Sequence, residues 1–419
     1  MTARLASPLQ SIRRVSGGGL LMLSLLACAA VAPSIALADE SDAASTKADE
    51  DKTPPRVEAV EAPSQEELQA AIDRGVAFLV ADQNADGSWG SATHTKNLNI
   101  YAPIPGAHHA FRTGTTALCI SGLIDVEADS SGADAKGAKR ALARAEDWLI
   151  DQLPRLRRAT PDALYNVWGH AYSLQALVRM HAKEERTERK EKIAELIAEQ
   201  FDKLDRYESV DGGWGYYDFR VGSQKPATDS ISFVNAAVLV AYADARDAGF
   251  EPPSRTVERA VEATLRQRKP DFTYLYGEYL KDSPLAPINC PPGSLGRSQA
   301  CNVALRLWGD EKVTDEVLDT WLHRLFARNY WLSIGRKRPI PHESHAQVAG
   351  YFYYFGHYYG ALCIEELPEE KRDFFRAHMA KTLMALQEKD GSWWDYPLYA
   401  YHRPYGTGFA LQTLAPSRK

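Results

Sequence analysis

The sequence lacks a positive charge surplus, has few cysteines and contains only one long apolar run. Five cysteines in 419 residues exclude a small fold held together by disulfides. The 49 lysines and arginines are outnumbered by 55 acidic residues, so we predict no binding to nucleic acid. No Gly-x-Ser-x-Gly elbow, P-loop or dinucleotide fingerprint occurs, which removes the usual support for serine hydrolases, nucleotidases and oxidoreductases. With 45% hydrophobic residues, the chain can nevertheless bury a large core.

The long apolar run lies near the N-terminus and is typical of an export signal. Basic residues precede the run at 20–32, and Ala36-Leu37-Ala38 forms a small-x-small cleavage site. We predict that residues 1–38 are a secretory signal peptide, that the protein is exported to a periplasmic or secreted location, and that no transmembrane segment remains after cleavage. A lipoprotein signal that ends before Cys28 is the alternative, and it would anchor the chain to a membrane.

Residues 39–64 differ in composition from the rest of the chain. The segment is rich in acidic residues and proline and has almost no large apolar side chain. It therefore buries too little surface to offset the entropy lost on ordering. We predict a disordered linker at 39–64, followed by a single folded domain at 65–419.

Four cysteines remain in the predicted domain. Cys119 and Cys363 have apolar neighbours, a context in which a thiol packs as a small hydrophobic group. Cys290 and Cys301 flank a segment rich in proline and glycine, and two interpretations stay open. An oxidising compartment would permit a disulfide between them. Alternatively, Cys301 lies inside a helix and Cys290 in the loop before it, both reduced.

Apolar residues recur with the period of a helix from residue 64 onward, and no alternating pattern predicts a strand. Ser64 and Glu67 have the spacing of a capping box at the start of the first helix. Polar-faced helices then alternate with more apolar ones. We expect the polar-faced helices near 64–84, 139–153, 191–204, 256–268, 314–327 and 372–387, and the apolar ones near 113–124, 168–180, 230–245, 297–308, 346–363 and 407–414.

The alternation of the two kinds of helix predicts an all-α fold with two layers. Amphipathic helices suit an outer layer around inner helices that are apolar on most sides. Repeated units of this kind form closed or stacked arrays in which neighbours bury one another. We therefore predict an (α/α)6 toroid of six helical hairpins, with an open superhelix as the alternative.

A repeated motif resembles the signature of squalene and oxidosqualene cyclases. Arg74-Gly75-Val76-Ala77-Phe78-Leu79 is followed by Gln83, Gly87 and Trp89, residues 387–393 repeat the second half, and Asp211-Gly212-Gly213-Trp214 repeats the turn. The chain thus resembles the toroid superfamily of terpenoid cyclases and protein prenyltransferases. The signature has a structural role: glycine permits the turn, glutamine can bond backbone groups at the helix end, and tryptophan packs over the turn.

The known chemistry of this superfamily does not transfer residue by residue. The Asp-x-Asp-Asp acid motif of hopene-type cyclases and the Asp-Asp-x-x-Asp magnesium motif of terpene synthases are both missing. The zinc ligands of protein prenyltransferases would fall at Ala349, Tyr351 and Gly406, where the required side chains are lost. His342 and His345 are one residue short of the usual zinc spacing. Although His357 would give a third ligand, we predict no metal and no cofactor.

All inner helices of such a ring run in the same direction, so the loops that lead into them gather at one end, where we expect a site. The residues predicted as proton carriers or polar anchors are His170, His345, His402 and Tyr405. The residues predicted to hold an anion at the helix N-termini are Arg112, Arg297 and Arg403. The residues predicted to line an aromatic cavity are Trp168, Tyr351, Tyr354 and His357. Core packing is the alternative for the aromatic run at 351–359, and a packed or capping role is the alternative for His170.

Three hypotheses for function follow. In the leading one, an exported toroid binds an apolar or isoprenoid-like ligand in its central cavity, as a divergent enzyme or as a binding protein. In the second, the toroid is a polysaccharide lyase-like enzyme whose Tyr or His removes a proton while Arg stabilises a uronate. In the third, the ring is a non-enzymatic scaffold that binds partners on its faces. The predicted ligand is thus a small molecule or a glycan.

Overall fold

The computed structural model describes residues 54–96, 105–128, 130, 132–219, 225–227 and 229–418. The predicted signal peptide and the first part of the predicted linker lie outside these residues. The described part consists of helices and connecting loops and contains no β-strand. None of its helices combines the length and the hydropathy of a membrane span.

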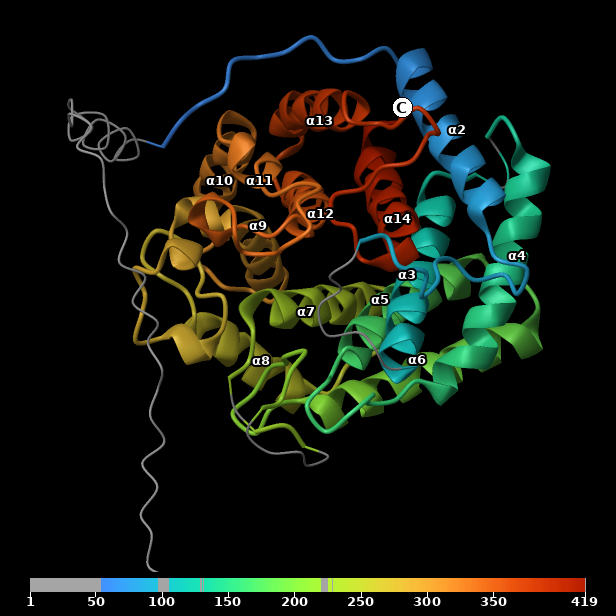
Figure 1. The fold of residues 1–419 in the computed structure, drawn as a ribbon, viewed down its shortest axis with the longest axis horizontal. Helices are drawn as coiled ribbons and strands as arrows, with labels where there is room; N and C mark the ends of the chain where they lie inside the picture. Colours follow the sequence, from blue (N-terminus) through green and yellow to red (C-terminus); the bar gives the residue numbers. More distant parts are fainter. Residues whose placement is uncertain are drawn as a thin grey trace, which may run out of the picture. The chain divides into compact units, whose positions relative to one another are not determined.

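Six inner helices form a closed ring (Figure 1). They are α3 (Pro105–Asp125), α5 (Asn166–Lys183), α7 (Ser232–Asp247), α9 (Pro291–Leu307), α12 (Phe352–Glu365) and α14 (His402–Leu414). Each packs against the next in chain order, and α14 packs against α3, which closes the ring. The predicted all-α toroid is confirmed, and the open superhelix is excluded.

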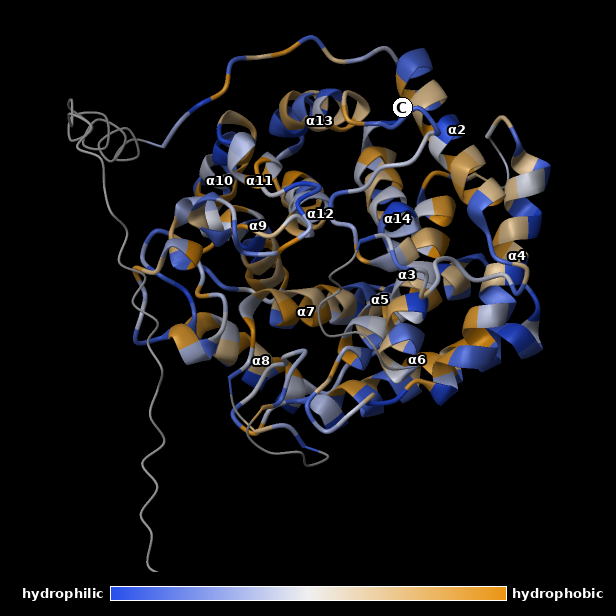
Figure 2. Ribbon diagram, in the orientation of Figure 1, coloured by the Kyte–Doolittle hydropathy of each residue, from blue (hydrophilic) through white to orange (hydrophobic). Residues whose placement is uncertain are grey.

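Six outer helices surround this ring. They are α2 (Gln65–Asp82), α4 (Ala135–Gln152), α6 (Thr187–Tyr207), α8 (Ser254–Arg266), α10 (Asp315–Ala327) and α13 (Glu369–Met384). Each outer helix from α4 onward packs on the inner helix that precedes it, and α2 packs on α14. Figure 2 shows hydrophilic and hydrophobic residues interleaved along outer helices such as α4 and α6. The helices predicted to have a polar face therefore form the outer layer, and the helices predicted to be more apolar form the inner layer.

The turn of the repeated motif connects one outer helix to the next. After α2, the Gln83 side chain donates hydrogen bonds to the carbonyl oxygens of Gly87 (2.9 Å) and of Ala141 in α4 (2.7 Å). The indole N–H of Trp89 donates to the carbonyl of Leu79 at 2.8 Å. The carbonyl of Leu79, in the last turn of α2, thus obtains a donor. The same indole bond, also 2.8 Å, recurs from Trp214 to Leu204 and from Trp393 to Leu383.

Gly391, in the turn after α13, provides a test of this connection. It has φ of +89°, and a Cβ built there would overlap the carbonyl oxygen of Arg74 in α2. Gly249 has φ of +88° but no atom within 4 Å of such a Cβ. We expect Gly391→Ala to lower the free energy of unfolding by about 3 kcal/mol and Gly249→Ala by about 1 kcal/mol, because only the first adds a steric clash to the left-handed backbone cost. Chemical denaturation measures both, and equal losses would contradict a role for this turn in closing the outer layer.

Residues 54–63, the last part of the predicted disordered linker, form an extended segment along α10 and α13 (Figure 1). The backbone N–H of Val57 donates to Nδ1 of His323 in α10 at 3.1 Å. Nε2 of His378 in α13 donates to the carbonyl oxygen of Glu58 at 2.9 Å. The composition of this segment indicates that it has no core of its own, and the ring supplies the contacts that hold it.

A polar cluster, here called the polar floor, closes the ring at the end where the inner helices finish. It consists of Asp125, Gln175, Arg179, Asp244 and Tyr358. Nε of Arg179 donates to Asp125 at 2.8 Å, and its Nη1 lies 3.4 Å from Asp244. The amide of Gln175 donates to Asp244 at 2.8 Å and to the hydroxyl of Tyr358, across the ring in α12, at 3.1 Å. Four inner helices are thereby connected across the lumen.

The four cysteines of the ring are free thiols. Cys301 is buried within α9, and Cys290 is the residue that precedes this helix. The structure therefore agrees with the interpretation that both cysteines are reduced, with Cys301 inside a helix and Cys290 before it. Cys119 and Cys363 are fully buried, as their apolar neighbours predicted.

Candidate functional site

A cavity of about 760 Å³ lies at the end of the ring where the inner helices begin. Its walls come from the second and third turns of α3, from the first turns of α5, α7, α12 and α14, and from the loops that lead into inner helices. This volume lies within the roughly 300–1,000 Å³ range of sites that enclose small molecules. The cavity therefore lies at the end of the toroid that the helix direction predicted.

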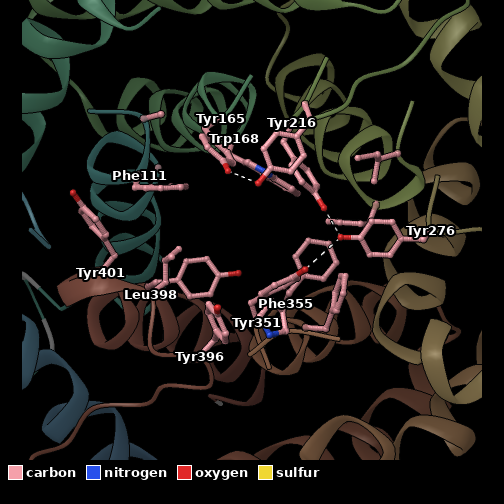
Figure 3. A pocket seen from close by; sticks show the side chains of 18 of the residues that line it. Phe111, Tyr165, Trp168, Tyr216, Tyr276, Tyr351, Phe355, Tyr396, Leu398 and Tyr401 are labelled. Carbon is pink, nitrogen blue, oxygen red and sulfur yellow. Dashed lines mark hydrogen bonds between the residues drawn. The ribbon is translucent and has the colours of Figure 1, made fainter. Parts of the chain in front are cut away.

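Aromatic side chains form more than half of the cavity lining. Figure 3 shows Phe111, Tyr165 and Trp168 on one side of the space and Tyr351 and Tyr396 on the other. No arginine or lysine from the described residues lines the cavity. The faces of aromatic rings attract apolar and cationic ligands, so this wall favours such ligands over anions.

Asp395 places a carboxyl group in this aromatic wall. The residue is 1% exposed, and its Oδ2 accepts a hydrogen bond from the backbone N–H of Tyr354 at 3.1 Å. Its Oδ1 has no hydrogen-bond partner among the described residues. Burial raises the pKa of Asp395 to about 7, although backbone N–H groups and the charge of Arg336 oppose the shift. Near neutral pH the carboxyl group is therefore often protonated, as a general acid must be.

A second polar feature is a chain of hydroxyl groups that ends at His342. The hydroxyls of Tyr216 and Tyr276 are hydrogen bonded, and that of Tyr276 lies 3.3 Å from the hydroxyl of Tyr351 (Figure 3). The Tyr351 hydroxyl lies 3.0 Å from Nε2 of His342, whose Nδ1 lies 2.7 Å from the carbonyl oxygen of Gln347. Because a carbonyl only accepts, Nδ1 carries the hydrogen, and Nε2 of the neutral ring accepts from Tyr351.

Asp218 is a further carboxylate of the lining, and its charge is already compensated. Nη2 of Arg158 donates to its Oδ2 at 3.1 Å, and both side chains are largely buried. Asp218 is thus held by a guanidinium group, whereas Oδ1 of Asp395 has no hydrogen-bond partner among the described residues. Asp395 is therefore the better candidate for an acid.

Four of the residues predicted for the site line the cavity: Trp168, Tyr351, His402 and Tyr405. Trp168 stacks on Tyr172 with ring centroids 5.6 Å apart. Nδ1 of His402 donates to the carbonyl of Tyr399 at 2.6 Å, and burial lowers the pKa of its imidazole. The ring brings these four residues together from helices that are far apart in the sequence.

His170 does not line the cavity. Its ring stacks on Tyr207 of α6, and its Nδ1 is hydrogen bonded to the side chain of Gln200 at 2.8 Å. Burial lowers the pKa of His170 to about 4. This arrangement matches the alternative interpretation, a packed histidine between the two layers.

Tyr354 and His357 are buried within α12 and also lie outside the cavity lining. Nδ1 of His357 donates to the carbonyl oxygen of Tyr353 at 2.7 Å, and its Nε2 lies 2.8 Å from the amide of Asn329. The aromatic run thus divides: Tyr351, Phe352 and Phe355 line the cavity, whereas Tyr353 and Tyr354 pack in the core.

The predicted anion-binding residue Arg297 is enclosed behind the wall, with 1% exposure. Its guanidinium group donates to the carbonyl oxygens of Gly293 (2.7 Å), Ile288 (2.6 Å) and Tyr274 (3.3 Å). It also lies 5.1 Å from the ring centroid of Tyr276. The cation therefore holds the loop that carries Tyr276 and has no free face for a ligand.

The remaining predicted residues lie outside the cavity lining. Arg112 lies 3.5 Å from Asp86, and Arg403 is paired with Asp390. His345 is exposed. Among the described residues, no three His, Cys, Asp or Glu side chains are placed to hold a metal ion.

None of Asp395, Tyr216, Tyr276 and His342 is among the residues predicted for the site, although Tyr216 and His342 lie in the loops where the site was expected. A signal for three of them lies in the repeat. Asp395 and Tyr216 each come two residues after the buried tryptophan of a repeat turn, Trp393 and Trp214. Tyr276 comes two residues after Tyr274. The backbone N–H of Tyr274 donates to the hydroxyl of Ser294 in the next inner helix, as that of Trp393 donates to the hydroxyl of Thr407. This position faces the lumen in each case.

No protein-family model matches the sequence, and no curated protein is similar to it in sequence. Solved structures do share the fold. The cellobiose 2-epimerase from Spirochaeta thermophila DSM 6192 aligns over 84% of this chain and 95% of its own, with 16% identity and a TM-score of 0.53. The unsaturated glucuronyl hydrolase from Bacillus sp. GL1 aligns over 84% and 96%, with 13% identity and a TM-score of 0.53.

The α-1,6-mannanase from Salegentibacter sp. HEL1_6 aligns over 84% of this chain and 99% of its own, with 10% identity and a TM-score of 0.51. Identities this low show the fold alone. They do not show the narrower resemblance to terpenoid cyclases. By fold, the chain is an α/α toroid.

Proposed function

We propose that the protein is an exported enzyme that binds a mainly apolar, isoprenoid-like ligand in the aromatic cavity and protonates it from Asp395. The observation that carries this proposal is a buried carboxyl group in an aromatic wall, one oxygen of which has no hydrogen-bond partner in the described part of the chain. The exported location rests on the N-terminal sequence.

The cavity suits a reaction that passes through a cation. With an epoxide as ligand, the Asp395 proton would move to the epoxide oxygen, and the electron pair of the breaking C–O bond would stay on that oxygen. The carbon is left positive, and the new Asp395 carboxylate keeps its hydrogen bond from Tyr354. Rings such as Trp168 would lower the energy of the cation by cation–π attraction, which is worth about 2 kcal/mol or more when water is excluded.

Ligand binding tests this proposal directly. We expect calorimetry on the mature chain to detect binding of squalene, 2,3-oxidosqualene or geranylgeranyl diphosphate. Trp168→Ala should weaken that binding about tenfold, because an aromatic wall residue is lost. Tyr330→Ala is the control, since Tyr330 is 58% exposed and lies outside the cavity. If wild-type protein binds none of the three compounds, the proposal fails.

Turnover gives the second measurement. We expect Asp395→Asn to bind the same compound with similar affinity and to lose at least about 100-fold in kcat, the usual contribution of a general acid. If Asp395→Asn had an unchanged kcat, a group other than Asp395 would be the general acid.

A glycan-active enzyme is the second candidate. Many of the wall rings are tyrosines, which can stack on a sugar and also bond its hydroxyls. The similar structures named above include a mannanase and a cellobiose epimerase, enzymes whose names refer to carbohydrates, which also favours this candidate. The missing arginine and lysine side chains in the described lining disfavour a uronate. New ultraviolet absorbance from unsaturated ends, on incubation with uronate polymers, would support the lyase form of this candidate.

A further inference from the structure

We propose that His342 is the terminal base of a proton relay through Tyr351 and Tyr276 to Tyr216. The relay takes up the proton that a bound ligand loses after Asp395 has protonated it. This inference rests on the proposed function and adds a second catalytic group to the same cavity.

The hydrogen bonds of the chain run in one direction. The carbonyl of Gln347 fixes the hydrogen on Nδ1 of His342, so Nε2 can only accept, and it accepts from Tyr351. The Tyr351 oxygen is then free to accept from Tyr276, and the Tyr276 oxygen from Tyr216. A proton delivered to any of these oxygens therefore has a path of O–H donors that ends at His342.

All four side chains of the relay line the cavity, so a ligand can reach the chain at more than one point. The Tyr351 ring also packs edge-on against Tyr396, with centroids 5.5 Å apart, next to Asp395. The proposed acid and the proposed relay thus border the same part of the cavity. A donor and an acceptor of protons at one site are what a protonation followed by a deprotonation requires.

The charge states of His342 and the tyrosines before a ligand reacts favour proton transfer toward His342. Burial lowers the pKa of His342, and the charge of Arg297 lowers it further, while the hydrogen bond to Gln347 opposes the shift. The rings of Tyr276 and Tyr351 pack on the imidazole of His342, with ring centroids 5.3 Å and 6.1 Å from its own centroid. Burial raises the pKa of both tyrosines, so both hydroxyls keep their hydrogens at neutral pH. At rest His342 is therefore neutral, and it is the member of the relay whose ring nitrogen can accept a proton.

The proton transfer balances without any further reactant. A C–H bond next to the cationic carbon breaks, and its electron pair forms the new C=C bond. The proton joins a tyrosine oxygen while each hydroxyl along the chain passes its own proton on, and the last one forms imidazolium at His342. Water at the mouth then removes this proton and reprotonates Asp395, so nothing is oxidised or reduced.

Nitrogen NMR on the full, histidine-labelled mature chain tests the relay without any ligand. We expect the His342 signals of a neutral ring with hydrogen on Nδ1. Tyr351→Phe should shift the Nε2 resonance most, and Tyr276→Phe and Tyr216→Phe progressively less, because each removes a donor farther away. Tyr172→Phe is the matched control, since Tyr172 lines the cavity but takes no part in the hydrogen bonds of the relay. A ring with hydrogen on Nε2, or no response to Tyr351→Phe, would overturn the relay.

Kinetics with 2,3-oxidosqualene give a readout that a purely structural role would not produce. We expect His342→Ala to lower kcat about 100-fold with KM changed less than threefold. Added imidazole should restore at least tenfold in His342→Ala and nothing in Tyr351→Phe. A folded His342→Ala variant that imidazole fails to rescue would contradict the base. If wild-type protein does not turn over this compound, the proposed function loses support, and the NMR measurement still decides the relay.

Discussion

Asp395→Asn is expected to make the protein more stable at pH 8, in addition to removing its acid. An aspartate in the unfolded chain has a pKa near 3.9, whereas burial raises the pKa of Asp395 to about 7. At roughly 1.4 kcal/mol per pKa unit, ionising this group in the folded state costs about 4 kcal/mol. Asparagine does not ionise, and its amide oxygen can accept the same bond from Tyr354.

The sign of the pH dependence follows from linkage. Below about pH 4 the carboxyl group is protonated in both states and costs nothing. As the pH rises from 4 to 7, the unfolded state loses the proton first, so the stability of the wild-type protein falls, and above pH 7 the loss is complete. Denaturation of wild-type protein and Asp395→Asn should therefore agree near pH 4 and differ by about 4 kcal/mol at pH 8.

A neighbouring carboxylate supplies the control with the opposite sign. Hydrogen bonds from Ser392 and the charge of Arg403 outweigh burial and lower the pKa of Asp390. Its contribution is present above the unfolded pKa and is lost as the pH falls, so Asp390→Asn should destabilise the protein at pH 8. If Asp395→Asn also destabilised at pH 8, the carboxyl group would not be the buried acid described here.

Arg179→Ala is expected to lower the free energy of unfolding by about 3 kcal/mol. Arg179 is 20% exposed and compensates Asp125 and Asp244, which are 24% and 31% exposed. Removing one member of such a cluster leaves charges without compensation, which costs more than the cluster itself contributes. Thermal or chemical denaturation measures the loss.

The pH dependence of this loss distinguishes unpaired charge from lost packing. Burial raises the pKa of Asp244 while the charge of Arg179 opposes the shift, so removal of the arginine lets the pKa rise further. The destabilisation should therefore shrink as the pH falls and the carboxylates are protonated. Arg155→Ala is the control, because its pair with Asp151 is about 60% exposed on both sides and contributes at most about 0.5 kcal/mol. A loss independent of pH would indicate packing alone.

The two-layer ring was predictable because amphipathic and apolar helices alternate so regularly. The residues at which the inner helices begin were harder to predict from the sequence. Helix α3 begins at Pro105 and α9 at Pro291, ahead of the expected starts at 113 and 297. Their first turns contain Pro, Gly and polar residues, which in a sequence are typical of loops. In the ring, Ala110 and Phe111 from this early part of α3 line the cavity, and the carbonyl of Gly293 in the first turn of α9 accepts a hydrogen bond from the buried Arg297.

The candidate site was predictable in location and in aromatic character, but only partly by residue. On a helix buried on all sides, polarity does not reveal which side faces the lumen. Trp168 and His170 illustrate this: two residues span about 200° of helix, so Trp168 faces the cavity and His170 the outer layer. Asp395 was not predicted because an isolated aspartate belongs to no recognisable motif. Only its position two residues after Trp393 of the repeat turn places it at the lumen.

The polar floor joins α5 to α12, on the opposite side of the ring, through the hydrogen bond from Gln175 to Tyr358. Neither residue lines the aromatic cavity. Substitutions at these two positions should therefore weaken the contact across the ring and leave the chemistry of the cavity wall unchanged.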